Sequence, residues 1–379
     1  MITMTRQSDS KITQQQPINV AVIGTVGVPA NYGGFETLVE QLIDNRKDPD
    51  IRYTVYCSGP HYADRPDTYK GANLRYIPLK ANGMQSIPYD ILSMIRAARE
   101  ADILLVLGVS GCVFLPLLRL FCKKRIVVNI DGLEHRREKW KPYIKKFLKY
   151  SEKCAVRNAD TVIADNQGIA DYVKDEYGME AVMIPYGGDQ AETSVDPKRR
   201  DEILAEKELA PKDYSLALCR IEPENNVRMI LEAFSRRPDE KLIFVGNWNN
   251  SAYGQELRRE FAKFPNIRME DAIYDLNVVN TLRSNCKYYL HGHSAGGTNP
   301  SLVEAMFFGV PILAYDVVYN RHSTEDSAIF FSDADSLSKL IGTITPEQAE
   351  SCGAAMREIA DRRYRWSQIA GEYESIVRP

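Results

Sequence analysis

A glycine-rich segment near the start of the chain has the composition of an anion-binding loop. The segment GTVGVPANYGGFE follows an apolar run, and its last glycines, Gly33 and Gly34, directly precede a helical pattern. At the start of a helix, free backbone N–H groups and the helix dipole favour a negative charge. The spacing is neither G-x-G-x-x-G nor a loop ending in G-K-[ST], which disfavours a nicotinamide dinucleotide site and a P-loop. The alternative is that the glycines serve only a tight turn.

A second glycine-rich segment, HGHSAGGTNPSLVEAMFFG, follows a predicted strand and spans residues 291–309. Thr298 or Asn299 suits the N-cap of a helix, and Pro300 suits its first turn. Gly309 suits the end of that helix. The sequence therefore predicts a short helix that begins directly after a flexible loop.

The loop before this helix can form an anion cradle. Gly296 and Gly297 let backbone amides approach a ligand closely. Glu304 lies one turn inside the helix, and its side chain is expected to point back toward the amino end. A carboxylate there cannot bind phosphate, but it can accept two hydrogen bonds from a ribose diol. We therefore predict a nucleoside diphosphate site, with a well-capped core helix as the alternative; its residues are Glu304, His293, Gly296, Gly297, Thr298, Asn299, Pro300 and Ser301.

Two further polar segments follow predicted strands. Arg220, in CRIEPENN, can neutralise phosphate charge with its forked guanidinium, or else form a surface ion pair. Asp131, in NIDGLEHRREKW, follows a buried strand of the first half and faces the expected cleft. Its carboxylate can orient an acceptor or stabilise positive charge on a sugar ring, or it can cap the turn at Gly132. His135, further along, is expected to face solvent.

Basic and aromatic residues interleave over residues 136–153, in RREKWKPYIKKFLKYSEK. Lysines beside an anionic membrane each contribute about 1 kcal/mol, so this segment is a candidate for peripheral contact with the inner face of a membrane. An amphipathic helix packed on a sheet, with a solvated lysine face, is the alternative.

The composition limits the function. The chain has 379 residues, 44% of them hydrophobic, and a formal net charge of −3, which disfavours disorder and nucleic-acid binding. Its seven cysteines include no C-x-x-C pair, which favours a reducing cytoplasm over a disulfide framework or a zinc ribbon. The D-x-D strings at 48–50 and 333–335 lie where a loop and a helix cap explain them. We therefore expect no metal and no other cofactor.

No segment is expected to direct secretion or to cross a membrane. Residues 1–17 lack an apolar core and are predicted to form a disordered tail. The apolar run 103–118 is shorter than the roughly 20 residues of a spanning helix and is interrupted by glycine and proline. We therefore predict a buried strand, a glycine turn and the start of a helix in this run.

Short apolar runs that alternate with helical patterns must position the candidate residues. Continuous apolar strands separated by helices indicate parallel sheets covered on both faces. The helix after the first strand is predicted from residues 35–43, whose apolar members share one face. The strands are predicted at 19–24, 52–57, 103–107, 125–130, 161–164, 182–185, 215–219, 241–246, 288–290 and 310–314, with a further one at 328–331.

A polar segment, residues 186–213, divides the strands into two similar series. We therefore predict an α/β protein of two doubly wound, Rossmann-like parallel-sheet domains that face a central cleft. Ligands of such sheets bind at the carboxyl ends of the strands, where the motifs above lie.

With these motifs in hand, the chain resembles the retaining glycosyltransferases of family four, which have the GT-B architecture. It is most similar to a bacterial branch that includes polysaccharide rhamnosyltransferases. The resemblance rests on GVPANYGGFE, DGLEHRREKW, ADNQGIADYV, IPYGGD, RIEPENN and GHSAGGTNPSLVEAM, which occur in this order from residue 18 onward. It implies an acceptor-side domain at 18–187, a nucleotide-sugar domain at 188–360 and a helix at 361–379 that crosses back to the first domain.

The resemblance also implies a role for each candidate residue. Arg220 and the amides of residues 298–301 would contact the pyrophosphate, and Glu304 would hold the nucleotide ribose. Gly33 and Gly34 would lie over the diphosphate from the other domain. Asp131 matches a position, often histidine in the wider family, that lies near the reacting sugar.

Two features depart from the wider family, although the branch shares them. Gly296 stands eight positions before Glu304, where a second glutamate is usual. Asn225 and Asn226 stand where a lysine is usual. The second cation for the phosphates is therefore open, and the candidates are His291, His293, Arg228 and Arg321.

The sequence thus predicts a cytoplasmic enzyme that transfers a sugar from a nucleoside diphosphate-sugar to a hydroxyl of a lipid-linked oligosaccharide. The branch favours dTDP-L-rhamnose as the donor. A sugar-nucleotide epimerase of the same architecture and a non-catalytic nucleotide-sugar-binding subunit are the alternatives. Acceptor-independent conversion of the donor would indicate the epimerase, and tight binding without turnover would indicate the subunit.

Overall fold

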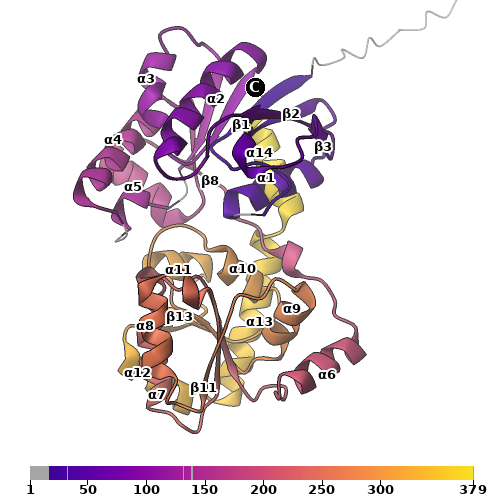
Figure 1. Cartoon of the computed structure of the whole chain (residues 1–379), viewed down its shortest axis with the longest axis vertical. Coiled ribbons are helices and arrows are strands. Elements are labelled where there is room, and N and C mark those ends of the chain that lie inside the picture. Colours follow the sequence, from indigo (N-terminus) through magenta and orange to yellow (C-terminus); the bar gives the residue numbers. More distant parts are fainter. Residues whose placement is uncertain (1–16, 32, 131, 138–139, 379) are drawn as a thin grey trace, which may run out of the picture.

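The computed structural model describes residues 17–31, 33–130, 132–137 and 140–378, which form two α/β halves arranged end to end (Figure 1). Each half has a largely parallel sheet with helices packed on it, so the predicted architecture of two Rossmann-like domains is confirmed. The tail predicted at 1–17, apart from Pro17, lies outside the described residues, and so does Asp131.

The first half contains an eight-stranded sheet in the order β3-β4-β2-β1-β5-β6-β7-β8, which is parallel except where β3 meets β4. Its strands are β1 (Ile18–Ile23), β2 (Ile51–Ser58), β3 (Thr68–Tyr69), β4 (Ala72–Ile77), β5 (Ile103–Leu107), β6 (Arg125–Asn129), β7 (Thr161–Ala164) and β8 (Val182–Met183). Its helices are α1 (Gly34–Asp44), α2 (Ser86–Glu100), α3 (Leu115–Leu118), α4 (Pro142–Asn158) and α5 (Gln167–Tyr177).

The second half contains a six-stranded parallel sheet in the order β11-β10-β9-β12-β13-β14. Its strands are β9 (Ser215–Leu218), β10 (Leu242–Val245), β11 (Ile267–Glu270), β12 (Tyr289–His291), β13 (Ile312–Tyr315) and β14 (Ile329–Phe331). Its helices are α6 (Pro197–Glu206), α7 (Val227–Ser235), α8 (Ala252–Phe261), α9 (Leu276–Asn285), α10 (Pro300–Met306), α11 (Val318–Ser323), α12 (Ala334–Thr343) and α13 (Pro346–Arg363).

The predicted strands are confirmed to within two residues at each end, but the sequence pattern missed β3, β4 and β11. Strands β3 and β11 are edge strands, and β4 lies between β3 and β2. Buried and exposed residues alternate along the first part of β4, and β11 is only half-buried. The search for continuous apolar runs misses β4 and β11 because their sequences, ANLRYI and IRME, mix polar with apolar residues.

The apolar run 103–118 forms the structure that its glycines predict. Strand β5 is fully buried, a turn follows, and the short helix α3 ends the run. Among the residues that the structure describes, no helix combines the length and apolar character needed to cross a bilayer.

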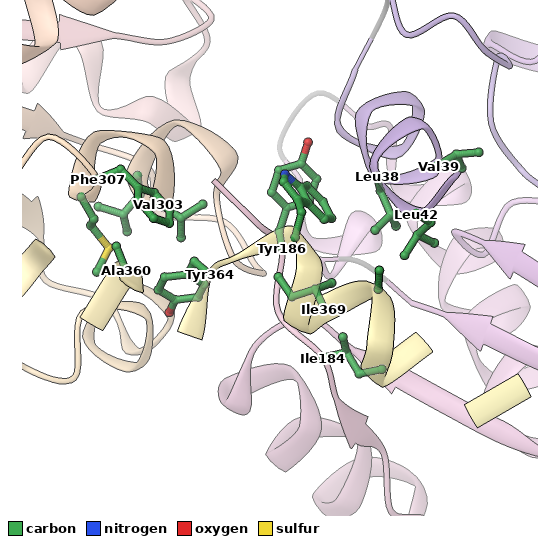
Figure 2. Close-up of a cluster of buried hydrophobic side chains, with 14 of the residues drawn as sticks. Leu38, Val39, Leu42, Ile184, Tyr186, Val303, Phe307, Ala360, Tyr364 and Ile369 are labelled. Carbon is green, nitrogen blue, oxygen red and sulfur yellow. The ribbon is translucent and has the colours of Figure 1, made fainter. Parts of the chain in front are cut away.

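The chain passes between the halves twice, at residues 184–190 and again at residues 364–366, and these two segments together are called the crossing below. After the second passage, helix α14 (Trp366–Val377) packs against α1 of the first half. Figure 2 shows Ile184 and Tyr186 beside Ile369, with Leu38 and Leu42 of α1 nearby. The rings of Tyr186 and Trp366 meet edge to face, 4.9 Å apart between centroids. One hydrophobic cluster therefore continues from the first half through the crossing into the second.

Gly24, at the end of β1, has no room for a side chain. Its φ is +91°, and a Cβ atom would lie 2.0 Å from the carbonyl oxygen of Leu107 on β5. The chain can turn out of the sheet here only because this residue is glycine.

We expect Gly24→Ala to lower the free energy of unfolding by more than about 3 kcal/mol, because backbone strain and a clash with backbone act together. Gly71→Ala is the matched control, since Gly71 has φ +83° but nothing within 4 Å of its Cβ position. It should cost only the strain, about 1–2 kcal/mol. Urea denaturation followed by circular dichroism measures both, and equal losses would contradict the assignment.

Candidate functional site

A buried carboxylate holds the glycine loop after β1. Glu36, in the first turn of α1, is buried, and its Oε1 accepts hydrogen bonds from Thr25 Oγ1 at 2.8 Å and from Val26 N at 2.6 Å. Gly33 is the N-cap of α1 and Gly34 its first residue, as the sequence pattern predicts. The loop is therefore fixed at both ends, with the glycine pair at the interface between the halves.

The glycine pair lies directly against the second half. A Cβ atom on Gly33 would be 3.8 Å from Nη2 of Arg220. One on Gly34 would be 3.7 Å from Cγ of Pro300, the first residue of α10. The structure therefore brings three of the predicted motifs together, from the loops after β1, β9 and β12.

Arg220 presents its charge at this point. Its side chain is exposed, and in the described part of the chain its guanidinium has no hydrogen-bond or ion-pair partner. Its backbone is held firmly, because the carbonyl oxygen of Arg220 accepts a hydrogen bond from Asn225 Nδ2 at 2.7 Å. The surface ion pair considered as an alternative is therefore not formed, and the forked donor group is available to an anion.

The two asparagines that replace the usual lysine shape the loops around Arg220. Asn226 is in the left-handed conformation, with φ +49°, and its Nδ2 donates to the carbonyl oxygen of Gly292 at 2.9 Å. Asn225 Oδ1 lies 2.7 Å from Nδ1 of His293. Because an amide oxygen only accepts, Nδ1 of His293 carries the hydrogen and its Nε2 keeps a lone pair.

The two histidines of the second glycine-rich segment are neutral at pH 7. Burial, with a smaller contribution from neighbouring His293, lowers the pKa of His291 to about 3. Burial and then the charge of Arg137 lower the pKa of His293 to about 4. At neutral pH His293 can therefore accept a hydrogen bond, but neither histidine can supply the second cation.

The two arginines proposed for that role are already paired. Arg228 lies 2.8 Å from Glu260, and Arg321 contacts Asp316 at 2.6 Å and Asp326 at 2.8 Å. All four candidates for a second cation are thus either neutral or neutralised.

The loop before α10 touches the first half through its backbone. A Cβ atom on Gly296 would lie 2.8 Å from Cα of Gly132, and one on Gly297 would lie 2.7 Å from Oδ2 of Asp165. Both glycines have positive φ, +46° and +71°. The close approach expected of these glycines is therefore made to the other half of the protein.

Two of the backbone amides predicted to bind the pyrophosphate, those of Thr298 and Ser301, already donate hydrogen bonds within the protein. Thr298 N donates to Asp165 Oδ2 at 2.8 Å, and Thr298 Oγ1 donates to the carbonyl oxygen of Asp165. Ser301 N donates at 3.0 Å to Asn299 Oδ1, the cap of α10, and Pro300 has no N–H. Contact of these two amides with a diphosphate would thus require Asp165 to release Thr298 and the cap to release Ser301.

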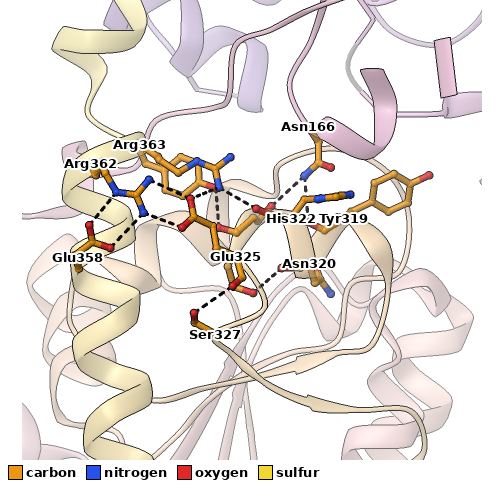
Figure 3. A network of polar contacts seen from close by, with 12 residues as sticks. Asn166, Tyr319, Asn320, His322, Glu325, Ser327, Glu358, Arg362 and Arg363 are labelled. Atoms are coloured by element: carbon orange, nitrogen blue, oxygen red, sulfur yellow. Dashed lines mark hydrogen bonds and ion pairs between the residues drawn. The ribbon is translucent and has the colours of Figure 1, made fainter. Parts of the chain in front are cut away.

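The contact made by Asp165 extends to the next residue. Asn166 Nδ2 donates to the carbonyl oxygen of Tyr319 and to Ser323 Oγ, both at 3.1 Å, and Figure 3 shows Asn166 above α11. The motif ADNQ, which suggested no individual role from the sequence, is therefore a polar joint between the halves.

Glu304 is half-buried, and two side chains hold it by hydrogen bonds. Neither of the two residues belongs to a motif that the sequence analysis identified. Gln190 Nε2 donates to its Oε1 at 2.8 Å, and Arg283 Nη2 donates to its Oε2 at 2.5 Å. Gln190 directly follows the motif IPYGGD, which gives a weak signal in the sequence. Arg283 lies inside α9 and gives none.

Asp131 lies outside the described residues, and the segment after it reaches the second half. Arg137 Nε lies 3.3 Å from Glu224 Oε1, and the same arginine pairs with Glu134 at 2.9 Å. His135 was expected to face solvent, and this prediction is wrong: its Nδ1 lies 2.9 Å from the buried carboxylate of Glu152. The sequence around His135 is hydrophilic, which suggested exposure. Its partner Glu152 lies 17 positions further along the chain, on α4, so the local sequence gives no sign of the contact.

The D-x-D strings serve local structure. Asp333 caps α12, accepting from Ser336 N at 2.7 Å, and Asp48 accepts from Asp50 N at 2.9 Å. Within the described ranges no group of three His, Cys, Asp or Glu side chains is placed to hold a metal ion, and the seven cysteines are free.

Two family models cover most of the chain. Residues 17–189 match a domain of unknown function, DUF1972. Residues 199–356 match the model described as glycosyl transferases group 1. Residues 199–356 are therefore a glycosyltransferase group 1 domain. A search of curated proteins finds no match to the chain.

Solved structures similar to this protein share the GT-B fold of the glycosyltransferases. Sucrose-phosphate synthase from Thermosynechococcus elongatus has a TM-score of 0.78 at 16% identity, over 96% of this chain and 98% of that one. Anabaena HepE in complex with UDP-glucose has a TM-score of 0.73 at 13% identity, over 95% and 99%. The trehalose-6-phosphate synthase OtsA has a TM-score of 0.69 at 11% identity, over 95% and 98%.

The buried His291 makes the stability of the glycosyltransferase domain depend on pH. Its pKa is near 3 in the folded protein and near 6.5 when exposed, so the unfolded chain binds the extra proton as the pH falls below about 6.5. Stability is therefore full above that value and falls as the pH decreases toward 3. Between about pH 7 and pH 5 the loss should be about 1.5–2 kcal/mol from this residue.

Urea titrations at the two pH values test this assignment. His291→Gln, which stays neutral throughout, should lose correspondingly less stability over the same interval. An unchanged pH dependence in the variant would show that His291 is not held in its neutral form.

Proposed function

We propose that the protein is a metal-independent glycosyltransferase that moves a sugar from a nucleoside diphosphate-sugar to a hydroxyl acceptor. The observation that carries the proposal is the unpaired guanidinium of Arg220, which faces the glycine pair Gly33–Gly34 from the opposite half. The group 1 domain at 199–356 supports it, and so does the UDP-glucose bound to HepE, a protein of the same fold.

Arg220 is suited to the charge that develops in such a reaction. As the glycosidic bond to the diphosphate breaks, negative charge gathers on the leaving group and positive charge on the sugar ring. A guanidinium held by its backbone, beside a glycine loop that admits close approach, stabilises the leaving group more in the transition state than in the ground state. Glu304 would hold the ribose, and Asp131 would act near the reacting sugar.

The finer identity of the reaction rests on the resemblance to the rhamnosyltransferase branch. We propose retention of anomeric configuration and dTDP-L-rhamnose as the donor. A panel of dTDP-, UDP- and GDP-sugars, followed by analysis of the product, tests the donor. Conversion of the donor without acceptor would instead indicate the epimerase, and binding without turnover would indicate a binding subunit.

Arg220→Ala should lower kcat/KM by about 30- to 1,000-fold, corresponding to about 2–4 kcal/mol of lost transition-state stabilisation. Arg259→Ala, which removes an exposed arginine from α8, is the matched control and should leave kcat/KM unchanged. Activity of the wild type should persist in EDTA. A loss of less than tenfold for Arg220→Ala would remove this residue from the reaction.

We further propose a lipid-linked oligosaccharide as the acceptor and peripheral contact with the inner face of the membrane. Helix α4 carries an exposed stripe of alternating rings and charges, formed by Tyr143, Lys146, Tyr150, Lys153 and Arg157. A groove of about 560 Å³ between α4 and α5 is lined mainly by basic side chains of α4. Such a surface attracts anionic headgroups.

The turn after α3 carries exposed apolar side chains. Helix α3 packs against α4, and in the turn that follows it Leu120 is 80% and Phe121 62% exposed. A protein surface that joins uncovered apolar groups to lysines matches the boundary between headgroups and acyl chains. The proposed contact therefore combines residues of 136–153 with the turn after α3.

Neutralising three cations of the stripe should weaken binding to vesicles rich in phosphatidylglycerol. The variant Lys146→Gln, Lys153→Gln, Arg157→Gln should lose about 3 kcal/mol, or roughly a hundredfold, in partitioning. The control, with the same change in charge, is Lys198→Gln, Arg259→Gln, Lys263→Gln on exposed residues of the second half. Cosedimentation measures both, and equal losses would indicate a non-specific effect of net charge.

A further inference from the structure

The carboxylate of Glu304 is fixed from two sides. Arg283, whose side chain is buried on α9, donates to Oε2 at 2.5 Å, and Gln190 donates to Oε1 at 2.8 Å. Each carboxylate oxygen can accept about two hydrogen bonds, so each keeps one position for a further donor. The two protein donors therefore determine where those remaining positions point.

Gln190 joins Glu304 to the crossing between the halves. Its Oε1 accepts a hydrogen bond from Trp366 Nε1 at 2.6 Å, so its amide is held at both ends and cannot rotate freely. Trp366 N donates to Asp189 Oδ1 at 2.8 Å. The two segments of the crossing are thus tied together at the residue that also orients Glu304.

The backbone of the crossing is closely packed at Gly187 and Gly188, where no side chain would fit. A Cβ atom on Gly187 would lie 2.5 Å from Cδ2 of Trp366, and one on Gly188 would lie 2.8 Å from the carbonyl carbon of Val303 on α10. Gly188 N also donates to the carbonyl oxygen of Tyr364 at 2.9 Å. The backbone of the crossing therefore rests directly on the helix that carries Glu304.

We propose that Gln190 is a positioning residue that aims Glu304 at the hydroxyl groups of the donor's nucleoside sugar and couples their recognition to the crossing through Trp366. The inference rests on the proposed function, because it takes a nucleoside as the ligand of Glu304. Trp366 begins α14, which packs on α1, and Gly33 is the N-cap of α1. A continuous set of contacts thus leads from Glu304 through Gln190, Trp366, α14 and α1 to the glycine pair of the other half.

The test compares ligands that differ only in the sugar hydroxyls Glu304 would contact. UDP and GDP are each titrated calorimetrically against their 2′,3′-dideoxy counterparts, and dTDP, which has no 2′-hydroxyl, against its 3′-deoxy counterpart. In the wild type, loss of the hydroxyls should weaken the best of the three about tenfold or more, as for hydrogen bonds to a charged group. Gln190→Leu should reduce this ratio, because Glu304 is then held by Arg283 alone and its Oε1 is no longer oriented.

Gln368→Leu is the matched control. Gln368 lies on the exposed face of α14, where its Nε2 donates to Glu372 Oε1 at 3.2 Å, so it makes the same kind of contact away from the site. The ratio between natural and dideoxy nucleotide should stay at the wild-type value in this variant. Because the ratio is measured within one protein sample, a partly unfolded sample does not alter it.

Trp366→Phe tests the link to the crossing. Phenylalanine keeps a ring against Gly187 but removes the Nε1–H that holds Gln190. Although Trp366 does not bond to Glu304, we expect its variant to lower the ratio part of the way toward that of Gln190→Leu. A wild-type ratio in Trp366→Phe would overturn the coupling.

The outcomes separate the two proposals. If the wild type binds a nucleoside diphosphate and shows the hydroxyl dependence, but Gln190→Leu keeps the same ratio, the role of Gln190 is overturned and the proposed function stands. If the wild type binds none of the three nucleoside diphosphates, the proposed function fails and the inference fails with it.

Discussion

The relative position of the two halves depends on the steric fit of the crossing. Gly187 is covered by the indole of Trp366, and Gly188 rests on the backbone of α10, with no space for a Cβ atom at either residue. Each half has its own sheet and could keep its fold in several relative positions. The contact between two glycines, one tryptophan and one helix selects among these positions, because close-packed surfaces fit in few ways.

Neither half contains a complete site by itself. The first half supplies a glycine loop fixed by the buried Glu36, but the described part of that loop contains no cation. The second half supplies Arg220 and Glu304, and the residue that faces the guanidinium of Arg220, Gly33, belongs to the first half. The crossing therefore matters for function as well as for structure, because it determines the distance between the guanidinium of Arg220 and the glycine pair.

The sequence predicted what is encoded locally. Caps, glycine turns and apolar periodicity placed α1, α10 and the central strands, because each depends on residues a few positions apart. It could not identify Gln190, Arg283 or Asp165, since their partners lie 114, 21 and 133 positions away. The role of Asn225 and Asn226 could not be predicted for the same reason. In the sequence they stand where a lysine is usual, whereas in the structure they shape the loop through hydrogen bonds to residues far along the chain.

The pairing of Asp165 with Thr298 bears directly on how a donor would enter. One N–H group supplies one strong hydrogen bond, so the amide of Thr298 cannot serve both the carboxylate of Asp165 and a phosphate oxygen. A diphosphate near Arg220 would also repel that carboxylate. If Thr298 binds the donor as the motif predicts, the carboxylate of Asp165 must first release this amide, next to the polar joint of Asn166 with α11. The contact that has to change for the donor to bind is therefore one between the halves, whose relative position is set at the crossing.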